Sequence, residues 1–332
     1  MKLINIEENS SVPKYKQIIF SVETAIAEKR LKKRDKLPSI NKVALEFSLS
    51  RDTVLQAYDD LKKRGIIIAM PGKGYYIKSE EFTTEQRIFL LFDELNSFKE
   101  DLYHSFKETM GTFARIDIFF HYFSIDVFKK LINENNGDYS KYVIMPTILK
   151  DAPKYIKKLP KNDVYILDQT NDELKEYPSI HQNFVSDIYS ALLTGKEALD
   201  KYEKLVMIFP DFKQPPGMRI GFNKFCNDYQ LQHEIIPDIK DYTLEKGQVF
   251  IIPDDRHLVN VIEEANSKNL VIGTDIGIIS YNDTHLKKVV ANGITTISTD
   301  FTAMGTILAE MVLGQRKEQI ANKSRLILRG SL

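Results

Sequence analysis

Residues 36–77 read KLPSINKVALEFSLSRDTVLQAYDDLKKRGIIIAMPGKGYYI, and this stretch decides the fold of the N-terminal part of the chain. Two series of apolar residues recur in it at helical spacing, one within residues 40–47 and one within residues 54–61. Ser39 and Ser50 stand where N-caps are preferred, and Gly65 stands where a helix commonly ends. Only two residues separate the helices, so we expect them to cross steeply, as in a helix-turn-helix unit.

The flanking residues complete this unit. Ahead of it, apolar residues recur at helical spacing from Tyr15 to Ile26, just after Pro13. Behind it, an apolar run at residues 66–69 is followed by a glycine-rich turn at residues 70–74 and by the sequence Tyr-Tyr-Ile. This order predicts a β-hairpin. Three helices followed by a hairpin predict a winged helix-turn-helix domain over residues 1–78.

The charge distribution points to a polyanionic partner for this domain. The whole chain of 332 residues has no net charge, but residues 1–78 contain 16 Lys and Arg against 9 Asp and Glu. Arg51 lies in the first turn of the predicted second helix of the unit, where it can bind a phosphate or the O6 and N7 atoms of guanine. Thr53 can donate to a phosphate, and Lys73 lies between two glycines that let the backbone approach a groove.

The same residues resemble the GntR family of bacterial winged-helix regulators. The similarity includes Leu37-Pro38-Ser39, Ser50-Arg51 and Thr53-Val54, and it extends to Gly72-x-Gly74 in the wing. The sequence departs from the family at Asn41-Lys42, where many relatives have Arg-Glu. The resemblance implies binding to operator DNA, and the expected DNA-contacting residues are Ser39, Ser50, Arg51, Thr53, Gly72, Lys73 and Gly74.

Residues 79–86 are polar, acidic and without periodicity, so we expect a linker there. Beyond it, apolar runs alternate with amphipathic stretches, which predicts mostly parallel sheets covered by helices. Strands are expected at residues 88–92, 116–120, 142–145, 164–167, 205–209, 249–252, 270–273, 277–280 and 295–297. Helices are expected at residues 123–135, 183–201 and 256–268. Nine strands are many for one sheet, so we expect residues 87–332 to form two α/β lobes.

Motifs for chemistry are absent from the sequence. There is no G-x-G-x-x-G after a strand, no phosphate-binding G-x-x-x-x-G-K-[ST] and no G-x-S-x-G. The six histidines show no paired-ligand spacing, and the single Cys226 lies on the apolar side of a predicted helix. We therefore expect no catalytic residues, metal or cofactor. The sequence also has no signal peptide, no apolar run long enough for a membrane span and no disulfide framework, which favours a cytoplasmic protein.

The C-terminal part resembles the effector domain of the LacI family, which shares the fold of periplasmic sugar-binding proteins. The similarity lies in Tyr281-Asn282-Asp283-Thr284, Thr295-Thr296-Ile297, Asp300-Phe301 and Met304-Gly305, with a weaker one at Arg219-Ile220-Gly221-Phe222. The whole chain is therefore similar to GntR regulators that carry a LacI-like sugar-sensing domain, of the arabinose-repressor type. The spacing of Arg219 to Gly221 is one residue shorter than in many LacI-like proteins.

Ligands of open α/β sheets bind at the carboxyl ends of the strands, and sugar hydroxyls need both donors and acceptors. The expected effector-binding residues are Asp93, Asp168, Arg219, Asp255 and Asn282. A monosaccharide is the preferred effector, with L-arabinose and L-fucose as guesses, and a purine or a phosphorylated sugar is the alternative. The expected function is that of an allosteric repressor that acts as a homodimer.

Two other classes were weighed against this one. Some GntR regulators carry an aminotransferase-like domain, but that domain is longer and needs a Schiff-base lysine for which no matching pattern is present. A pure scaffold protein would not explain Arg51 and the glycine-rich wing.

Overall fold

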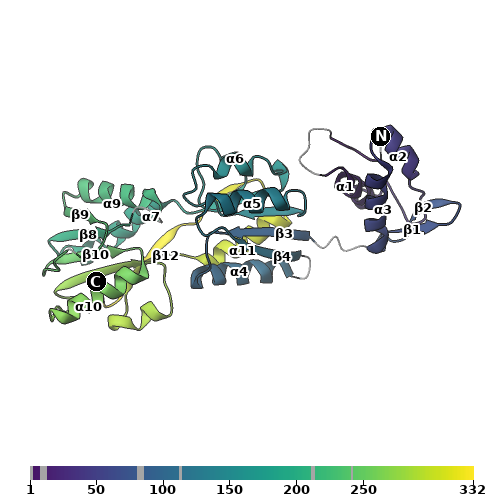
Figure 1. The fold of residues 1–332 in the computed structure, drawn as a ribbon. Helices are drawn as coiled ribbons and strands as arrows, with labels where there is room; N and C mark the ends of the chain where they lie inside the picture. The colour runs from purple at the N-terminus through teal and green to yellow at the C-terminus, as the bar shows by residue number, and fades with distance from the viewer. Residues whose placement is uncertain (1–2, 8–12, 81–85, 112–113, 211–213, 241) are drawn as a thin grey trace.

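The computed structural model describes residues 3–7, 13–80, 86–111, 114–210, 214–240 and 242–332. These residues form a small helical domain and two α/β lobes, which follow one another in Figure 1. None of the helices within the described ranges is long and apolar enough to span a membrane.

The N-terminal domain is a winged helix. Its elements are α1 (Lys14–Ala27), α2 (Ile40–Glu46), α3 (Arg51–Lys63), β1 (Ile67–Met70) and β2 (Gly74–Ile77). The two predicted N-caps are confirmed: Ser39 accepts a hydrogen bond from the backbone N–H of Lys42, and Ser50 accepts one from Thr53. The buried ring of Tyr58 joins the parts, because its hydroxyl donates to the carbonyl of Pro38 over 2.8 Å and its ring packs edge-on against Tyr75.

Lobe 1 is built on a six-stranded parallel sheet in the order β13-β7-β6-β5-β3-β4. Its strands are β3 (Gln86–Phe92), β4 (Ala114–Phe120), β5 (Lys141–Ile144), β6 (Val164–Asp168), β7 (Ser179–His181) and β13 (Gln319–Ala321). Its helices are α4 (Ser97–Met110), α5 (Ile125–Asn135), α6 (Ala152–Ile156), the 3-10 turn η2 (Lys161–Asp163) and α11 (Phe301–Leu313).

Lobe 2 has a second six-stranded sheet in the order β14-β12-β11-β10-β8-β9, in which only β14 runs antiparallel to its neighbour. Its strands are β8 (Lys204–Ile208), β9 (Gln232–Ile236), β10 (Gln248–Ile252), β11 (Ile276–Tyr281), β12 (Thr295–Thr299) and β14 (Ser324–Ile327). Its helices are α7 (Phe184–Thr194), α8 (Lys196–Leu199), α9 (Pro216–Asp228) and α10 (Asp255–Ser267), with the 3-10 turns η3 (Leu286–Lys288) and η4 (Val290–Asn292).

Each sheet is buried on both faces, which explains why its central strands are apolar throughout. Along β3, Ile88 and Leu90 pack toward α4 and α11, whereas Phe89 and Leu91 pack toward α5 and α6. Figure 1 shows these two helix pairs on opposite faces of the lobe 1 sheet. In lobe 2, α7 and α9 cover one face and α10 covers the other.

The chain passes between the lobes through three segments. The first joins β7 to α7, the second joins β12 to α11, and the third joins β13 to β14. The last helix of the chain, α11, therefore belongs to lobe 1 and packs on α4, although it follows a strand of lobe 2. This connectivity confirms the predicted two-lobed α/β architecture.

Most predicted strands are present, but one prediction was wrong. Residues 270–273 form a turn in which only Ile272 makes an isolated bridge, because Asn269 and Gly273 adopt positive φ and the carbonyl of Val271 accepts from the turn that follows. The short strands β7, β9, β13 and β14 were not predicted. The linker expected at residues 79–86 lies mainly at residues 81–85, outside the described residues, and Gln86 already belongs to β3.

Candidate functional site

The first candidate site is the N-terminal end of α3. Arg51 is the first residue of this helix and its side chain is exposed, as is that of Asp52. The backbone N–H groups of this turn face outward with the positive end of the helix dipole, which favours an anion such as a DNA phosphate. Arg51 is therefore placed at the position where a forked cation adds most to such binding.

The hydroxyl groups at this end are already engaged within the domain. Ser50 caps α3, and its oxygen lies 2.8 Å from the hydroxyl of Thr53. Ser39 caps α2 in the same way. The structure thus gives Ser39, Ser50 and Thr53 a local capping role that holds the two helices in place, next to any contact that they make with DNA.

The wing presents a second cation. Gly72 and Gly74 have φ of +70° and +108°, which side chains other than glycine rarely adopt, and they flank Lys73 at the tip. Lys73 is exposed, and its backbone N–H closes the turn by donating to the carbonyl of Met70 over 2.9 Å. Arg51 and Lys73 are the two predicted residues whose long side chains are free to reach a nucleic acid.

The second candidate site is a cavity of about 280 Å³ between the two lobes. Four of the five predicted effector residues line it: Asp93, Asp168, Asp255 and Asn282. Asp93 follows β3 and Asp168 ends β6, so both come from lobe 1. Asn282 follows β11 of lobe 2, whereas Asp255 is the first residue of α10 and not a strand end as expected.

On the lobe 1 side, Asp93 forms a buried ion pair with Lys99, which lies in the first turn of α4. Asp168 accepts a hydrogen bond from the side-chain amide of Gln182 over 2.5 Å. Burial raises the pKa of Asp168, and the attraction of Lys99 and the bond from Gln182 offset this only in part. Asp168 is also held at φ +69°, an uncommon conformation for a residue with a side chain.

On the lobe 2 side, Lys287 organises the cavity edge. Its ammonium donates to the carbonyls of Tyr281 and Asn282 and pairs with Asp255 over 2.7 Å. Burial lowers the pKa of Lys287, and Asp255 opposes this shift. Asn282 has φ +58°, and its side-chain amide has no hydrogen bond to the described residues, so it is available to a ligand.

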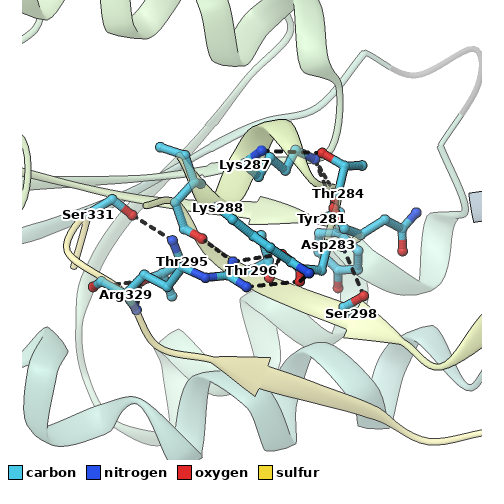
Figure 2. Close-up of polar contacts among 12 residues, drawn as sticks. Tyr281, Asp283, Thr284, Lys287, Lys288, Thr295, Thr296, Ser298, Arg329 and Ser331 are labelled. Carbon is cyan, nitrogen blue, oxygen red and sulfur yellow. Dashed lines mark hydrogen bonds and ion pairs between the residues drawn. The ribbon is translucent and has the colours of Figure 1, made fainter. Parts of the chain in front are cut away.

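The turn that carries these groups is locked from behind, as Figure 2 shows. Arg329 donates two hydrogen bonds, of 2.6 and 2.9 Å, to the two carboxylate oxygens of Asp283. Burial would raise the pKa of Asp283, but these bonds hold it below its usual value. A further bond runs from the backbone N–H of Asp283 to the hydroxyl of Ser298. Asn282 is therefore presented from a rigid support.

Arg219 is not among the residues that line the cavity. It lies in the first turn of α9, where its neighbours Pro215 and Met218 do line the cavity, but its own side chain is exposed and its guanidinium lies 5.9 Å from the ring centroid of Phe209. One further step along a helix turns a side chain by about 100°, which is enough to direct it away from the cavity.

The structure adds lining residues that the sequence did not indicate. Five aromatic rings border the cavity, and two of them, Phe98 and Phe301, pack with centroids 4.8 Å apart. The others are Phe123, Phe184 and Tyr281. Tyr281 and Phe301 lie within the motifs quoted for the LacI resemblance, so they could have been included. Lys99, Lys287 and Gln182 had no such signal.

These features define a class of protein: a DNA-binding transcription regulator in which a winged helix precedes a two-lobed, periplasmic-binding-protein-like domain. Comparison with known proteins gives the same division. Residues 14–77 match the model of the bacterial regulatory proteins of the gntR family, and residues 200–332 match that of the periplasmic binding protein-like domain.

The HTH-type transcriptional repressor YtrA of Bacillus subtilis is 31% identical over 105 residues, which are 31% of this chain and 81% of that protein. The arabinose metabolism transcriptional repressor of Geobacillus stearothermophilus is 31% identical over 70 residues, 21% of this chain and 19% of the repressor. The chain thus belongs to the GntR family of bacterial regulators. It spans less than two fifths of the length of several other curated relatives that it matches.

Among solved structures, the lac repressor dimer bound to operator and the anti-inducer ONPF superposes with a TM-score of 0.62. The match covers 75% of this chain and 94% of that one at 15% identity, so it shows a shared fold.

Proposed function

We propose that this protein is a repressor whose affinity for operator DNA is controlled by a monosaccharide bound between the two lobes. The observation that carries the proposal is the cavity itself, which combines polar groups from both lobes with aromatic walls. Sugars need such a combination, because their hydroxyls require donors and acceptors while their ring faces pack on aromatic rings. A ligand that contacts both lobes favours their closed arrangement.

A route from the lobes to the DNA-binding domain is present. Lys16 of α1 forms an ion pair with Asp138 in the loop before β5 of lobe 1. Burial, with the nearby charge of Arg87, lowers the pKa of Lys16 to about 8. A movement of lobe 1 therefore acts on α1, which packs directly on the recognition helix α3. In this proposal the operator affinity falls because the paired winged helices change their spacing.

The proposal requires two copies of the chain, since one winged helix makes few phosphate contacts. Lobe 2 carries an apolar surface suited to a second copy, formed by Val259 on α10 and by Leu286 and Val289 on the adjoining turn. Leu286 and Val289 are each 74% exposed, and the Asp255–Lys287 ion pair ties this turn to α10. We infer a homodimer through this surface, because large exposed apolar side chains that cluster mark interaction sites.

Light scattering tests the dimer. Leu286→Lys places a charge in the surface and should shift the protein toward monomer and weaken operator binding. Ile220→Lys is the matched control, because Ile220 is 55% exposed but lies on α9, which covers the opposite face of the lobe 2 sheet. A dimer that survives Leu286→Lys would place the interface elsewhere.

The effector is tested by thermal unfolding of the full chain against a panel of monosaccharides, followed by operator binding with each sugar that raises the midpoint. The operator is a duplex selected with the protein from random-sequence DNA. We expect at least one sugar to stabilise the protein and to weaken operator binding. If no sugar changes operator affinity, the proposal fails.

A further inference from the structure

The cavity between the lobes has a strong excess of negative charge. Its described lining contains five carboxylates, those of Asp93, Glu94, Asp168, Asp254 and Asp255, and two ammonium groups, those of Lys99 and Lys287. Residues 211–213 precede the lining residue Gln214 and are outside the described part, but their sequence Asp-Phe-Lys adds one charge of each sign. The excess of three negative charges therefore does not depend on them.

Both cations are already committed to groups of the protein. Lys99 is paired with Asp93, and these two side chains are each 7% exposed. Asp168 lies within the field of the same ammonium and is itself buried, so one cation serves two buried carboxylates. Lys287 is shared by Asp255 and two backbone carbonyls. Among the described lining residues, no cation remains for an anionic ligand.

A buried hydroxyl group also lacks a partner here. The phenol oxygen of Tyr281 is inaccessible to solvent and has no hydrogen bond, although the residue borders the cavity and is 5% exposed. Buried polar groups are normally satisfied, so an unpaired one beside a cavity points to a ligand that supplies the partner. An ammonium can donate to this oxygen and can also lie against the Phe98–Phe301 pair through a cation–π contact.

We propose that the effector is a monosaccharide that carries a protonated amine, and that its ammonium binds among Asp93, Asp168 and the hydroxyl of Tyr281. This inference rests on the proposed function of the same cavity. Closure of the lobes around a neutral sugar would bury carboxylates without a counter-charge, which is costly, whereas an ammonium offsets that cost. A phosphorylated or carboxylated sugar would add a further negative charge and is excluded by the same reasoning.

The test is calorimetric titration of the full chain with matched sugars. D-Glucosamine, D-galactosamine and D-mannosamine are compared with the parent hexoses, with their N-acetyl derivatives, which keep the shape and lose the charge, and with the hexose 6-phosphates. We expect at least one amine to bind about tenfold or more tightly than its neutral counterparts, since a charge-assisted hydrogen bond is stronger than a neutral one.

Asp168→Asn should reduce this preference severalfold while leaving the neutral sugars little affected. Glu134→Gln is the control, because it removes one exposed carboxylate at the far end of α5. The inference is overturned if neutral or phosphorylated sugars bind as tightly as the amines, or if no amine in the set binds at millimolar concentration. A neutral sugar that binds and weakens operator binding would overturn the amine but leave the proposed function standing.

Discussion

The hydroxyl of Thr299 donates a 2.5 Å hydrogen bond to the side-chain oxygen of Gln182, and this bond joins two of the three segments that cross between the lobes. The same hydroxyl lies 2.7 Å from that of Ser324 at the start of β14, so the third segment is included. Gln182 also donates to Asp168 in the cavity. A polar chain thus runs from the effector cavity to all three crossings.

Thr299→Val should weaken the coupling between the lobes. The substitution keeps the shape of the side chain but removes its hydroxyl, so the oxygen of Gln182 loses a partner. We expect a loss of about 1–3 kcal/mol in the free energy of unfolding and a smaller effect of the effector on operator affinity. Denaturant unfolding and operator titrations measure both.

The matched control for this substitution is Thr306→Val, since the Thr306 hydroxyl bonds only within α11, to the carbonyl of Thr302. Equal effects of the two substitutions would mean that the crossing network has no special part in the switch.

Asp168→Asn should stabilise the ligand-free protein at neutral pH. Because burial raises the folded-state pKa of this carboxyl, the folded state binds its proton more tightly than the unfolded state does. The wild type therefore loses stability as the pH rises from the ordinary carboxyl range through the folded-state pKa. Asparagine has no such titration, can still accept from Gln182 and tolerates positive φ well.

The measurement is the unfolding midpoint of both proteins from pH 4 upward. The advantage of the variant should be small at the acidic end and should grow with pH. An advantage that shrinks as the pH rises would show that the sign of the shift is wrong.

Gly221→Ala should destabilise lobe 2. A Cβ atom at this position on α9 would lie 2.3 Å from the carbonyl oxygen of Val185 on α7, and backbone atoms cannot move aside cheaply. We expect a cost of about 1–3 kcal/mol, typical of overpacking, in thermal or denaturant unfolding. Asn227→Ala, at an exposed position of the same helix, should have little effect. Comparable stability of the two variants would show that the helices can separate.

Arg51→Ala should weaken operator binding by about 1–3 kcal/mol if the guanidinium reads a guanine, without a change in the unfolding midpoint, because the side chain is exposed. Binding of the wild type should also fall steeply with salt, as expected for phosphate contacts. Arg256→Ala, an exposed arginine on α10, is the control. Unchanged operator affinity in a folded Arg51→Ala protein would remove this residue from the DNA interface.

Local sequence signals were sufficient for the winged helix, because caps such as Ser39 and Ser50 and the turn glycines act within a few residues of themselves. The central strands were also predictable, because burial on both faces makes them apolar. The edge strands were not: β13 pairs with β7 across about 140 residues of sequence, and its three residues carry no pattern of their own. The apolar residues 270–273 form a turn, since backbone conformation at Asn269 and Gly273 overrides hydropathy.

In the cavity, the acidic residues at strand ends were predictable because parallel sheets gather their carboxyl ends at one edge. The position of Arg219 on its helix was not, since it depends on how α9 packs. The lysines that pair with Asp93 and Asp255 come from a helix and a 3-10 turn whose placement only the tertiary structure gives.

The most direct test of the account is the operator affinity of wild type and of Asp255→Ala, each with and without the sugar found by screening. Fluorescence anisotropy on the selected operator measures all four values. We predict that the sugar weakens wild-type binding by about 1–3 kcal/mol, whereas Asp255→Ala binds operator like the ligand-free wild type and does not respond. A variant that responds like the wild type would contradict the assignment of the interlobe cavity as the effector site.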